Sequence, residues 1–224
     1  MKLKEILAGI PIAEGHAEDT LEITGIRYDS RHVQPGDLFV AVTGYATDGH
    51  KFIPMAVEQG AAAVLCERKP ECDIPYVLVE NSRYAMALAS ANFFGHPADS
   101  MTFVGITGTN GKTSSTYLLK TVLEKTLSAK VGLIGTIQNM IGDEIIETER
   151  TTPESCDVYR LLRQMADAGC RYGVMEVSSH ALALERVRGI TFRVGAFTNL
   201  TRDHLDFHRT MEDYCDAKAQ LFRQ

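Results

Sequence analysis

The sequence lacks a Cys-x-x-Cys pair and any long apolar run. Its five cysteines are scattered and odd in number, which is typical of free thiols in a reducing compartment rather than of a disulfide framework. No stretch approaches the roughly 20 apolar residues that span a bilayer, and residues 1–11 hold too short an apolar run for a secretory signal. We therefore expect a cytoplasmic protein with no membrane partner.

An excess of basic residues is also missing. The formal net charge is -6, which argues against a broad basic face for a polyanionic backbone and so against nucleic acid as a partner. Internal repeats and low-complexity tracts are absent too. With 45% hydrophobic and 23% charged residues, the 224-residue chain has the composition of a globular protein with one large domain or two ordinary ones.

The first hundred residues alternate short strand-like and helix-like runs, which indicates α/β architecture. We predict strands at 37–42, 62–66 and 76–79 and a helix at 53–59. A longer helix begins at Ser82 as N-cap and stops at Gly95, with Pro97 behind it. We place a domain boundary in residues 96–100, which gives domains 1–98 and 99–224.

The second domain opens with the strand, loop and helix order of a phosphate-binding unit. Residues 101–106 form an apolar strand, 107–112 a loop of small residues and 113–127 a helix. Further strands are expected at 131–136, 172–177 and 194–199, with a helix over 153–168.

The loop in residues 105–113 has the parts of a nucleotide site. Its glycines let backbone N–H groups converge on phosphate oxygens, Lys112 can reach the β/γ-phosphates and Thr113 can offer its hydroxyl to Mg²⁺. The strict P-loop pattern is missed by one residue, because position 106 is Ile, and a plain glycine-rich turn is the alternative. The predicted ATP-binding residues are Gly108, Thr109, Asn110, Gly111, Lys112, Thr113 and Ser114.

Polar groups follow two later strands. Glu176 ends one of them, where a carboxylate suits a metal ion, although a partly buried glutamate paired with an arginine is the alternative. His204 and His208 stand four residues apart, which would suit zinc on a helix. We discount zinc, because no third soft ligand is evident and Mg²⁺ beside a phosphate loop needs mainly oxygen ligands.

The last segment is predicted as a helix that starts with Thr210 and Asp213 as a capping box. Lys218 falls in its apolar stripe. A buried lysine has a lowered pKa, and a neutral amine can take up CO₂ to become an anionic carbamate. The periodicity alone favours the other interpretation, in which the side chain snorkels to water.

Two more segments leave alternatives open. Thr151-Thr152-Pro153-Glu154 can start a helix whose free N–H groups bind an anion, or it can be only a cap. In the first domain, Asp29-Ser30-Arg31 and residues 44–50 can bind a phosphorylated ligand or simply make turns.

Taken together, these motifs resemble the Mur ligase family. The segments that carry the resemblance are Asp29-Ser30-Arg31, residues 35–41, 48–53 and 105–113, Thr151-Thr152-Pro153, residues 176–182 and 197–206, and the helix that holds Lys218. The resemblance implies an α/β fold, with an N-terminal mixed α/β UDP-binding domain followed by part of a P-loop NTPase-like central domain.

The resemblance also implies a reaction. ATP would phosphorylate the free D-glutamate carboxylate of UDP-MurNAc-L-Ala-D-Glu, and the amine of a diamino acid, meso-diaminopimelate or L-lysine, would displace phosphate. By resemblance Lys112, Lys218 and His204 are catalytic. Thr113, Glu176, His204 and Lys218, the last as a carbamate made with CO₂, would hold Mg²⁺.

The same resemblance assigns substrate contacts. Ser30 and the loop 45–47 would meet the UDP part, and the muramoyl-dipeptide would be held by Thr151, Thr152, Ser178 and Arg186. Family members continue well past the carbamylated lysine into a C-terminal domain for the amino acid, whereas this sequence ends six residues after Lys218. We therefore expect that it does not complete the ligation alone; another Mur-type ligase, or a non-catalytic fragment that binds a UDP-sugar or nucleotide, is the alternative.

Overall fold

The computed structural model describes residues 1–44, 47–148 and 150–223, which form two compact units, Met1–Gly95 and His96–Gln224. The sequence prediction put the division after residue 98, and the structure puts it after Gly95. Gly95 has a φ of +71° and directly follows a helix, so the chain leaves the helix through the left-handed conformation that glycine adopts at little cost.

The first unit is built on a five-stranded sheet with the order β1-β5-β4-β3-β2. Strands β2, β3, β4 and β5 are parallel to one another, and β1 is antiparallel to β5. The strands are β1 Glu14–Gly15, β2 Ile26–Arg27, β3 Leu38–Val40, β4 Ala63–Cys66 and β5 Tyr76–Leu78, and the helices are α1 Leu3–Ile6, α2 Ile53–Glu58 and α3 Ser82–Phe93, with the 3-10 turns η1 Ser30–His32 and η2 Gly49–Phe52.

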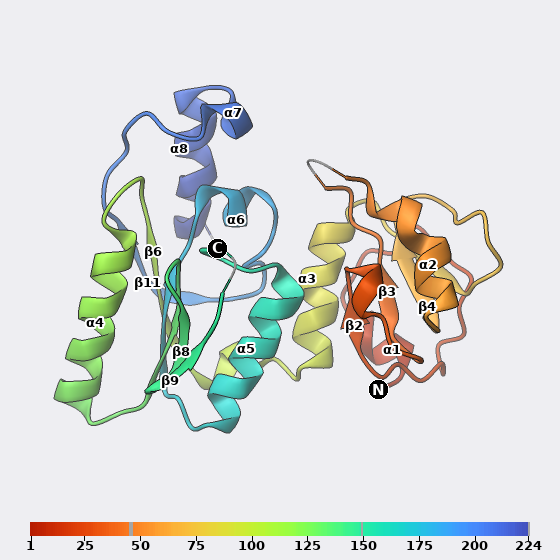
Figure 1. The fold of residues 1–224 in the computed structure, drawn as a ribbon, viewed down its shortest axis with the longest axis horizontal. Helices are drawn as coiled ribbons and strands as arrows, with labels where there is room; N and C mark the ends of the chain where they lie inside the picture. Colours follow the sequence, from red (N-terminus) through yellow and green to blue (C-terminus); the bar gives the residue numbers. More distant parts are fainter. Residues whose placement is uncertain (45–46, 149, 224) are drawn as a thin grey trace. The chain divides into compact units, whose positions relative to one another are not determined.

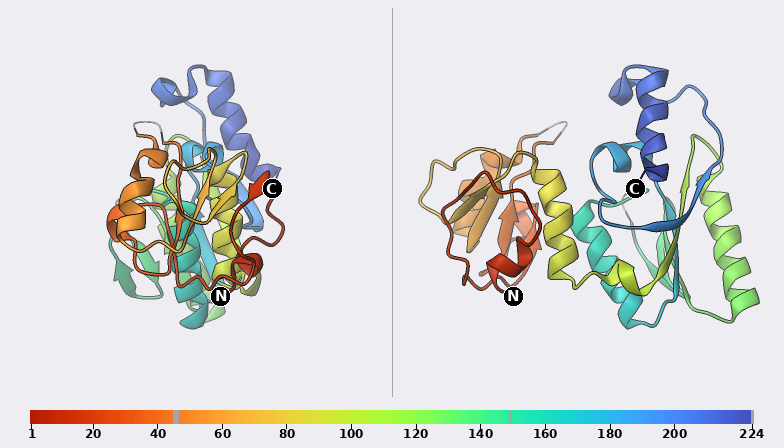
Figure 2. Two further views of the ribbon diagram at one scale, coloured as in Figure 1. Left: turned by 90° about the vertical axis from the view of Figure 1, so that its right-hand side faces the viewer. Right: turned by 180° about the vertical axis from the view of Figure 1, so that it is seen from behind.

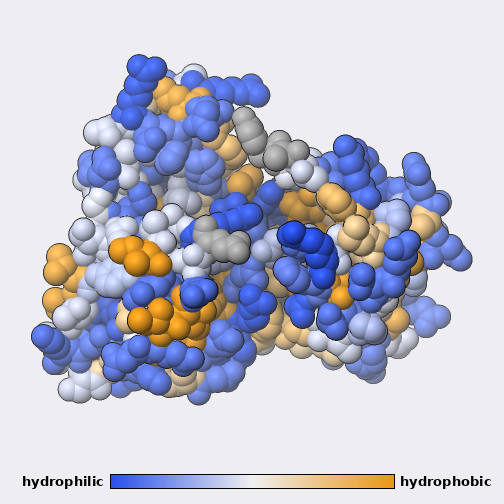
Figure 3. Space-filling view, in the orientation of Figure 1, coloured by the Kyte–Doolittle hydropathy of each residue, from blue (hydrophilic) through white to orange (hydrophobic). Residues whose placement is uncertain are grey.

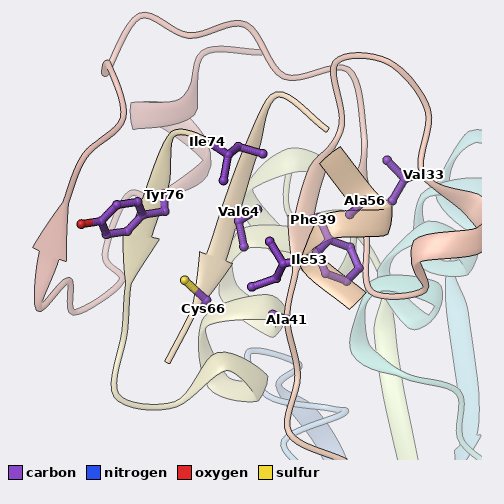
Figure 4. Close-up of a cluster of buried hydrophobic side chains, with 9 residues drawn as sticks. All are labelled: Val33, Phe39, Ala41, Ile53, Ala56, Val64, Cys66, Ile74 and Tyr76. Atoms are coloured by element: carbon purple, nitrogen blue, oxygen red, sulfur yellow. The ribbon is translucent and has the colours of Figure 1, made fainter. Parts of the chain in front are cut away.

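One core cluster lies between this sheet and α2. Phe39 of β3 and Val64 of β4 are fully buried beside Ile53 and Ala56 of α2, as Figure 4 shows. Every residue of β3 and β4 is buried, which fits central parallel strands covered on both faces. The predicted strands and the α2 helix are therefore present, each trimmed by one to three residues.

The start of α3 differs from the prediction. Asn81, not Ser82, is the N-cap, and its side chain accepts a hydrogen bond from the backbone N–H of Tyr84 at 3.0 Å. Ser82 instead donates its hydroxyl to Glu67 at 2.7 Å. Both residue types cap helices well, so their tertiary partners decide which of them does so.

The second unit contains a six-stranded sheet with the order β11-β6-β10-β7-β8-β9, in which the first four strands are parallel. Figures 1 and 2 show α4 and α5 on opposite faces of this sheet. The strands are β6 Thr102–Thr107, β7 Val131–Ile134, β8 Asn139–Ile141, β9 Glu144–Ile146, β10 Tyr172–Glu176 and β11 Phe192–Phe197, and the helices are α4 Lys112–Leu127, α5 Ser155–Asp167, α6 Ser179–Ala183, α7 Leu205–His208 and α8 Met211–Ala219, with η3 Pro97–Ser100 and η4 Gln220–Phe222.

Helix α5 begins two residues later than predicted, at Ser155. Its N-cap is Glu154, without a side-chain cap, so the expected start at Thr151-Thr152-Pro153 is wrong. The reason is that the hydroxyl of Thr152 donates to the backbone carbonyl of Glu176 at 2.8 Å and is not turned toward the helix. Both alternatives for this segment, an anion site at a threonine-capped helix start and a plain cap, assumed a threonine N-cap that the structure does not have.

The face drawn in Figure 3 is mostly hydrophilic and carries separate apolar patches. No helix within the described ranges is both long and apolar enough to cross a bilayer. All five cysteines are free in the structure.

Candidate functional site

The candidate site lies where the parallel strands of the second unit end. β6 leads into the phosphate loop, β10 ends at Glu176, and Gly135 follows β7. These strands pair in register, for example Glu176 with Ile106, so the loops that follow them leave the same edge of the sheet. This edge is where ligands bind in open α/β sheets.

The phosphate loop rests on the segment that follows β11. Thr109 N–H donates to the carbonyl of Asn199 at 2.9 Å, and Asn110 N–H donates to the Asn199 side chain at 3.0 Å. Thr198 donates its hydroxyl to the Asn110 carbonyl at 2.6 Å. Gly108 has a φ of +139°, and a Cβ there would lie 1.9 Å from Thr198 Oγ1, so this position requires glycine.

Lys112 opens α4 and folds back over the loop. Its Nζ donates to the carbonyls of Gly108 and Thr109, both at 2.8 Å. Burial lowers the pKa of Lys112, while the nearby Glu176 and Asp203 carboxylates act in the opposite direction. The ammonium group thus already lies on the loop where an anion would be neutralised, which fits a phosphate group.

Glu176 is fully buried and its carboxylate is held by hydroxyl and backbone groups. Thr113 donates its hydroxyl to Oε2 at 3.0 Å, and Thr136 donates its backbone N–H to Oε1 at 2.9 Å. Among the described residues, the hydrogen bonds to this carboxylate come from threonines and not from arginine, so the arginine-paired alternative is wrong. The neighbouring Thr113 hydroxyl makes this an oxygen-rich pair that suits Mg²⁺.

Lys218 of α8 is 1% exposed, so the snorkelling alternative is also wrong. Its Nζ donates to the Gly108 carbonyl at 2.8 Å and lies 4.4 Å from the centre of the Tyr214 ring. Burial, and then repulsion from Lys112, lowers the pKa of Lys218 from 10.5 to about 8. The lowered pKa raises the neutral fraction of Lys218 above that of an ordinary lysine, which fits an amine that reacts with CO₂.

His204 stands at the start of α7 with a left-handed φ of +53°. Its ring packs against His180, at 4.9 Å between ring centres, and its Nε2 is 3.5 Å from Asp203. His208 is buried and its Nε2 is hydrogen-bonded to Ser179 at 2.9 Å. Burial, followed by the charges of His204 and His208, lowers the pKa of His180 to about 4. In the described part of the chain no three His, Cys, Asp or Glu side chains form a metal cluster.

The predicted substrate residues of this unit form a connected group. The hydroxyl oxygens of Thr151 and Thr136 are 3.0 Å apart, and Thr152 is bonded to the end of β10. Ser178 caps α6 by accepting from Ala181 N–H at 3.1 Å. Arg186 donates to the Thr152 carbonyl at 3.1 Å, which brings its guanidinium to the Thr151-Thr152 segment.

Ser30 belongs to the first unit, where it is buried and its hydroxyl contacts Met55 Sδ at 3.3 Å. Of the predicted loop 45–47, Tyr45 and Ala46 lie outside the described residues. Thr47 is described, and its carbonyl accepts from Gly44 N–H at 2.9 Å.

Comparison of the sequence with protein-family models shows which family the chain belongs to. Residues 106–224 match the model of the Mur ligase middle domain, and residues 22–109 match the model described as the Mur ligase family, catalytic domain. The chain belongs to the Mur ligase family.

Among the relatives of this Mur ligase chain is the UDP-N-acetylmuramoyl-L-alanyl-D-glutamate--2,6-diaminopimelate ligase of Clostridium tetani. The two are 49% identical over all of this chain and 47% of the relative. The ligase of the same name from Listeria monocytogenes is 45% identical, over all of this chain and 45% of the relative. The chain therefore spans about half the length of the curated relatives it matches.

Solved structures give the same fold for this Mur ligase. A structure of a UDP-N-acetylmuramoyl-L-alanyl-D-glutamate--2,6-diaminopimelate ligase superposes with a TM-score of 0.83 and 28% identity, covering 99% of this chain and 45% of that one. The Thermotoga maritima MurF ligase in complex with ADP gives a TM-score of 0.59 and 26% identity, over 91% of this chain and 44% of that one. The predicted α/β fold class is confirmed.

Sequence reasoning missed one member of the site, Thr136. The available signal was its place two residues after the strand that ends at Ile134, at the same sheet edge as Glu176. The predicted strand 131–136 includes residues 135–136, so the prediction treats them as strand and not as loop residues.

Proposed function

We propose that this chain is the part of an ATP-dependent ligase that binds ATP and UDP-MurNAc-L-Ala-D-Glu, and that the ligase acts in the cytoplasm. The observation that carries the proposal is that Lys112 and Lys218 both donate hydrogen bonds to the Gly108 carbonyl of the phosphate loop. The names of relatives at 45 to 49% identity support 2,6-diaminopimelate as the added amino acid.

The proposed reaction has two balanced steps. The γ-phosphoryl group of ATP passes to the side-chain carboxylate of D-glutamate, which gives an acyl phosphate and ADP. An amine of 2,6-diaminopimelate then attacks the acyl carbon, phosphate leaves with the bonding electrons of the C–O bond, and the nitrogen loses a proton. Positioning and electrostatic stabilisation dominate such phosphoryl transfers.

Each residue has a proposed part in this reaction. Lys112 would replace its hydrogen bonds to two loop carbonyls with hydrogen bonds to phosphate oxygens. Its flexible side chain allows the ammonium group to make this change. Thr113, Glu176 and His204 would hold Mg²⁺, which supplies charge neutralisation for the transferred phosphoryl group. The backbone N–H groups of Gly108 and of residues 111–114 would surround the phosphates, because those of Thr109 and Asn110 already donate to Asn199. The ADP-bound Thermotoga maritima relative supports nucleotide binding in this fold.

Lys218 would act as a carbamate. As an ammonium group it lies close enough to Lys112 for the two cations to repel each other. Reaction of the neutral amine with CO₂ forms an N–C bond, releases one proton and leaves an anion. That anion would attract Lys112 and offer oxygen ligands to Mg²⁺.

The substrate contacts are proposed as follows. Ser178 and Arg186 would hold the muramoyl-dipeptide together with Thr151. The hydroxyl of Thr152 already donates to the Glu176 carbonyl, so its own contact with the substrate would come from the backbone. Ser30 and the loop 45–47 would meet the UDP part.

Calorimetric titration tests the proposal. The chain would be titrated with UDP-MurNAc-L-Ala-D-Glu, and with UDP-N-acetylglucosamine as control, in Mg²⁺ and bicarbonate. We expect binding of the first ligand with the control much weaker. Equal binding of both, or binding of neither by this chain and by a longer version of it, would overturn the proposal.

A further inference from the structure

Thr136 lies at the junction between the Glu176 carboxylate and the Thr151-Thr152 segment. Its hydroxyl oxygen is 3.0 Å from Glu176 Oε2 and 3.0 Å from the hydroxyl oxygen of Thr151. Its backbone N–H donates to Glu176 Oε1 at 2.9 Å. Thr136 therefore contacts both carboxylate oxygens of Glu176 and also Thr151, a predicted substrate residue.

The backbone around Thr136 is shaped to the carboxylate. A Cβ at the preceding residue, Gly135, would lie 2.5 Å from Glu176 Oε1, so glycine is needed for this close approach. The Gly135 N–H in turn donates a hydrogen bond to the side-chain oxygen of the buried Asn139, at 3.3 Å. The turn after β7 and Thr113 of α4 thus both hold the Glu176 carboxylate.

The hydrogens in this group can be assigned by counting. A carboxylate only accepts, and a threonine hydroxyl has one hydrogen to give. A hydrogen bond to an ionised carboxylate is the stronger of the two that Thr136 can make. Thr136 therefore gives its single hydroxyl hydrogen to Glu176 Oε2, while its oxygen stays within hydrogen-bond distance, 3.0 Å, of the Thr151 hydroxyl.

We propose that Thr136 is a positioning residue that orients the Glu176 carboxylate for a divalent cation and links it to Thr151. The inference rests on the proposed function, in which Glu176 holds Mg²⁺. Partners that orient a metal ligand commonly matter about 10- to 100-fold in metal affinity. Thr136 supplies two such bonds, one from its hydroxyl and one from its backbone.

The test compares binding of a non-hydrolysable ATP analogue in Mg²⁺ and in EDTA. Thr136→Val keeps the shape and the backbone bond and removes the hydroxyl. We expect this variant to lose about 10-fold of the Mg²⁺-dependent gain in affinity, with binding in EDTA unchanged. Thr136→Ser, which restores a hydroxyl, should recover most of that gain.

Thr121→Val is the matched control, because Thr121 is an exposed threonine of α4 whose hydroxyl donates only to the Tyr117 carbonyl within its own helix. It should behave as the unmodified chain does. A normal Mg²⁺-dependent gain in Thr136→Val, or an equal loss in Mg²⁺ and in EDTA, would overturn the role of Thr136 and leave the proposed function standing. An unmodified chain without any Mg²⁺-dependent gain would overturn both.

Discussion

The ammonium group of Lys218 donates a hydrogen bond to the backbone carbonyl of Gly108, a residue 110 positions earlier in the chain. The same carbonyl accepts from Lys112 at 2.8 Å. Two lysines thus converge on one oxygen of the phosphate loop. The arrangement places like charges side by side in a largely buried setting, which favours loss of one charge.

Lys218 should form a carbamate more readily than an ordinary lysine. With a pKa of about 8, about one-tenth of its side chains are neutral at pH 7, and the fraction rises as the pH rises through 8. In ¹³C-bicarbonate we expect a carbamate NMR signal that strengthens from pH 7 to 8. Lys218→Met should remove the signal, whereas Lys125→Ala, at an exposed lysine of α4, should keep it. A signal that survives in Lys218→Met would refute the assignment.

Lys112→Met should weaken binding of ATP by about 10- to 100-fold, because a hydrogen bond to a charged group contributes roughly 1.5–3 kcal/mol. The change keeps much of the stem and removes the charge. Fluorescence titration with a labelled ATP analogue measures the effect, and Lys125→Met serves as the control. Unchanged affinity in Lys112→Met would show that the loop binds no phosphate through this residue.

Gly108→Ala should destabilise the second unit by about 2 kcal/mol or more, since the position combines a positive φ with a steric clash at Thr198. Chemical denaturation followed by circular dichroism measures the free energy of unfolding. Gly15→Ala is the comparison, because Gly15 has open space around it, and we expect a change within about 0.5 kcal/mol. Similar values for the two variants would contradict the described loop geometry.

Glu154 should be a strong contributor to stability. Its carboxylate is 7% exposed and pairs with the Arg186 guanidinium, 13% exposed, at 2.8 Å. Glu154→Ala leaves a largely buried positive charge without this partner, so we expect a loss of about 3 kcal/mol in the free energy of unfolding.

Arg150 offers the matched comparison, since it pairs with the same carboxylate at 2.6 Å but is 50% exposed. Arg150→Ala should cost about 1 kcal/mol or less, because solvent screens an exposed ion pair. Thermal and urea unfolding of both variants would measure the difference. A larger loss in Arg150→Ala than in Glu154→Ala would reverse the interpretation.

The sequence by itself determined the features that depend on neighbours along the chain. The glycines, Lys112 and Thr113 at the start of a helix indicate a phosphate loop, because one strand end and one helix start bring these residues together. The apolar runs of β4, β6 and β10 were predicted for the same local reason. The boundary segment followed from Gly95 and Pro97, which end a helix through their own backbone preferences.

Only the tertiary structure decided which groups meet across the sheet edge. Periodicity favoured a solvent-facing Lys218, and the packing of α8 buries it against the loop. Thr152 and Ser82 had the right chemistry for helix caps, but their hydroxyls donate hydrogen bonds to the end of β10 and to Glu67 instead. A side chain with several possible hydrogen bonds makes the ones that the fold brings within reach, and sequence spacing does not contain those distances.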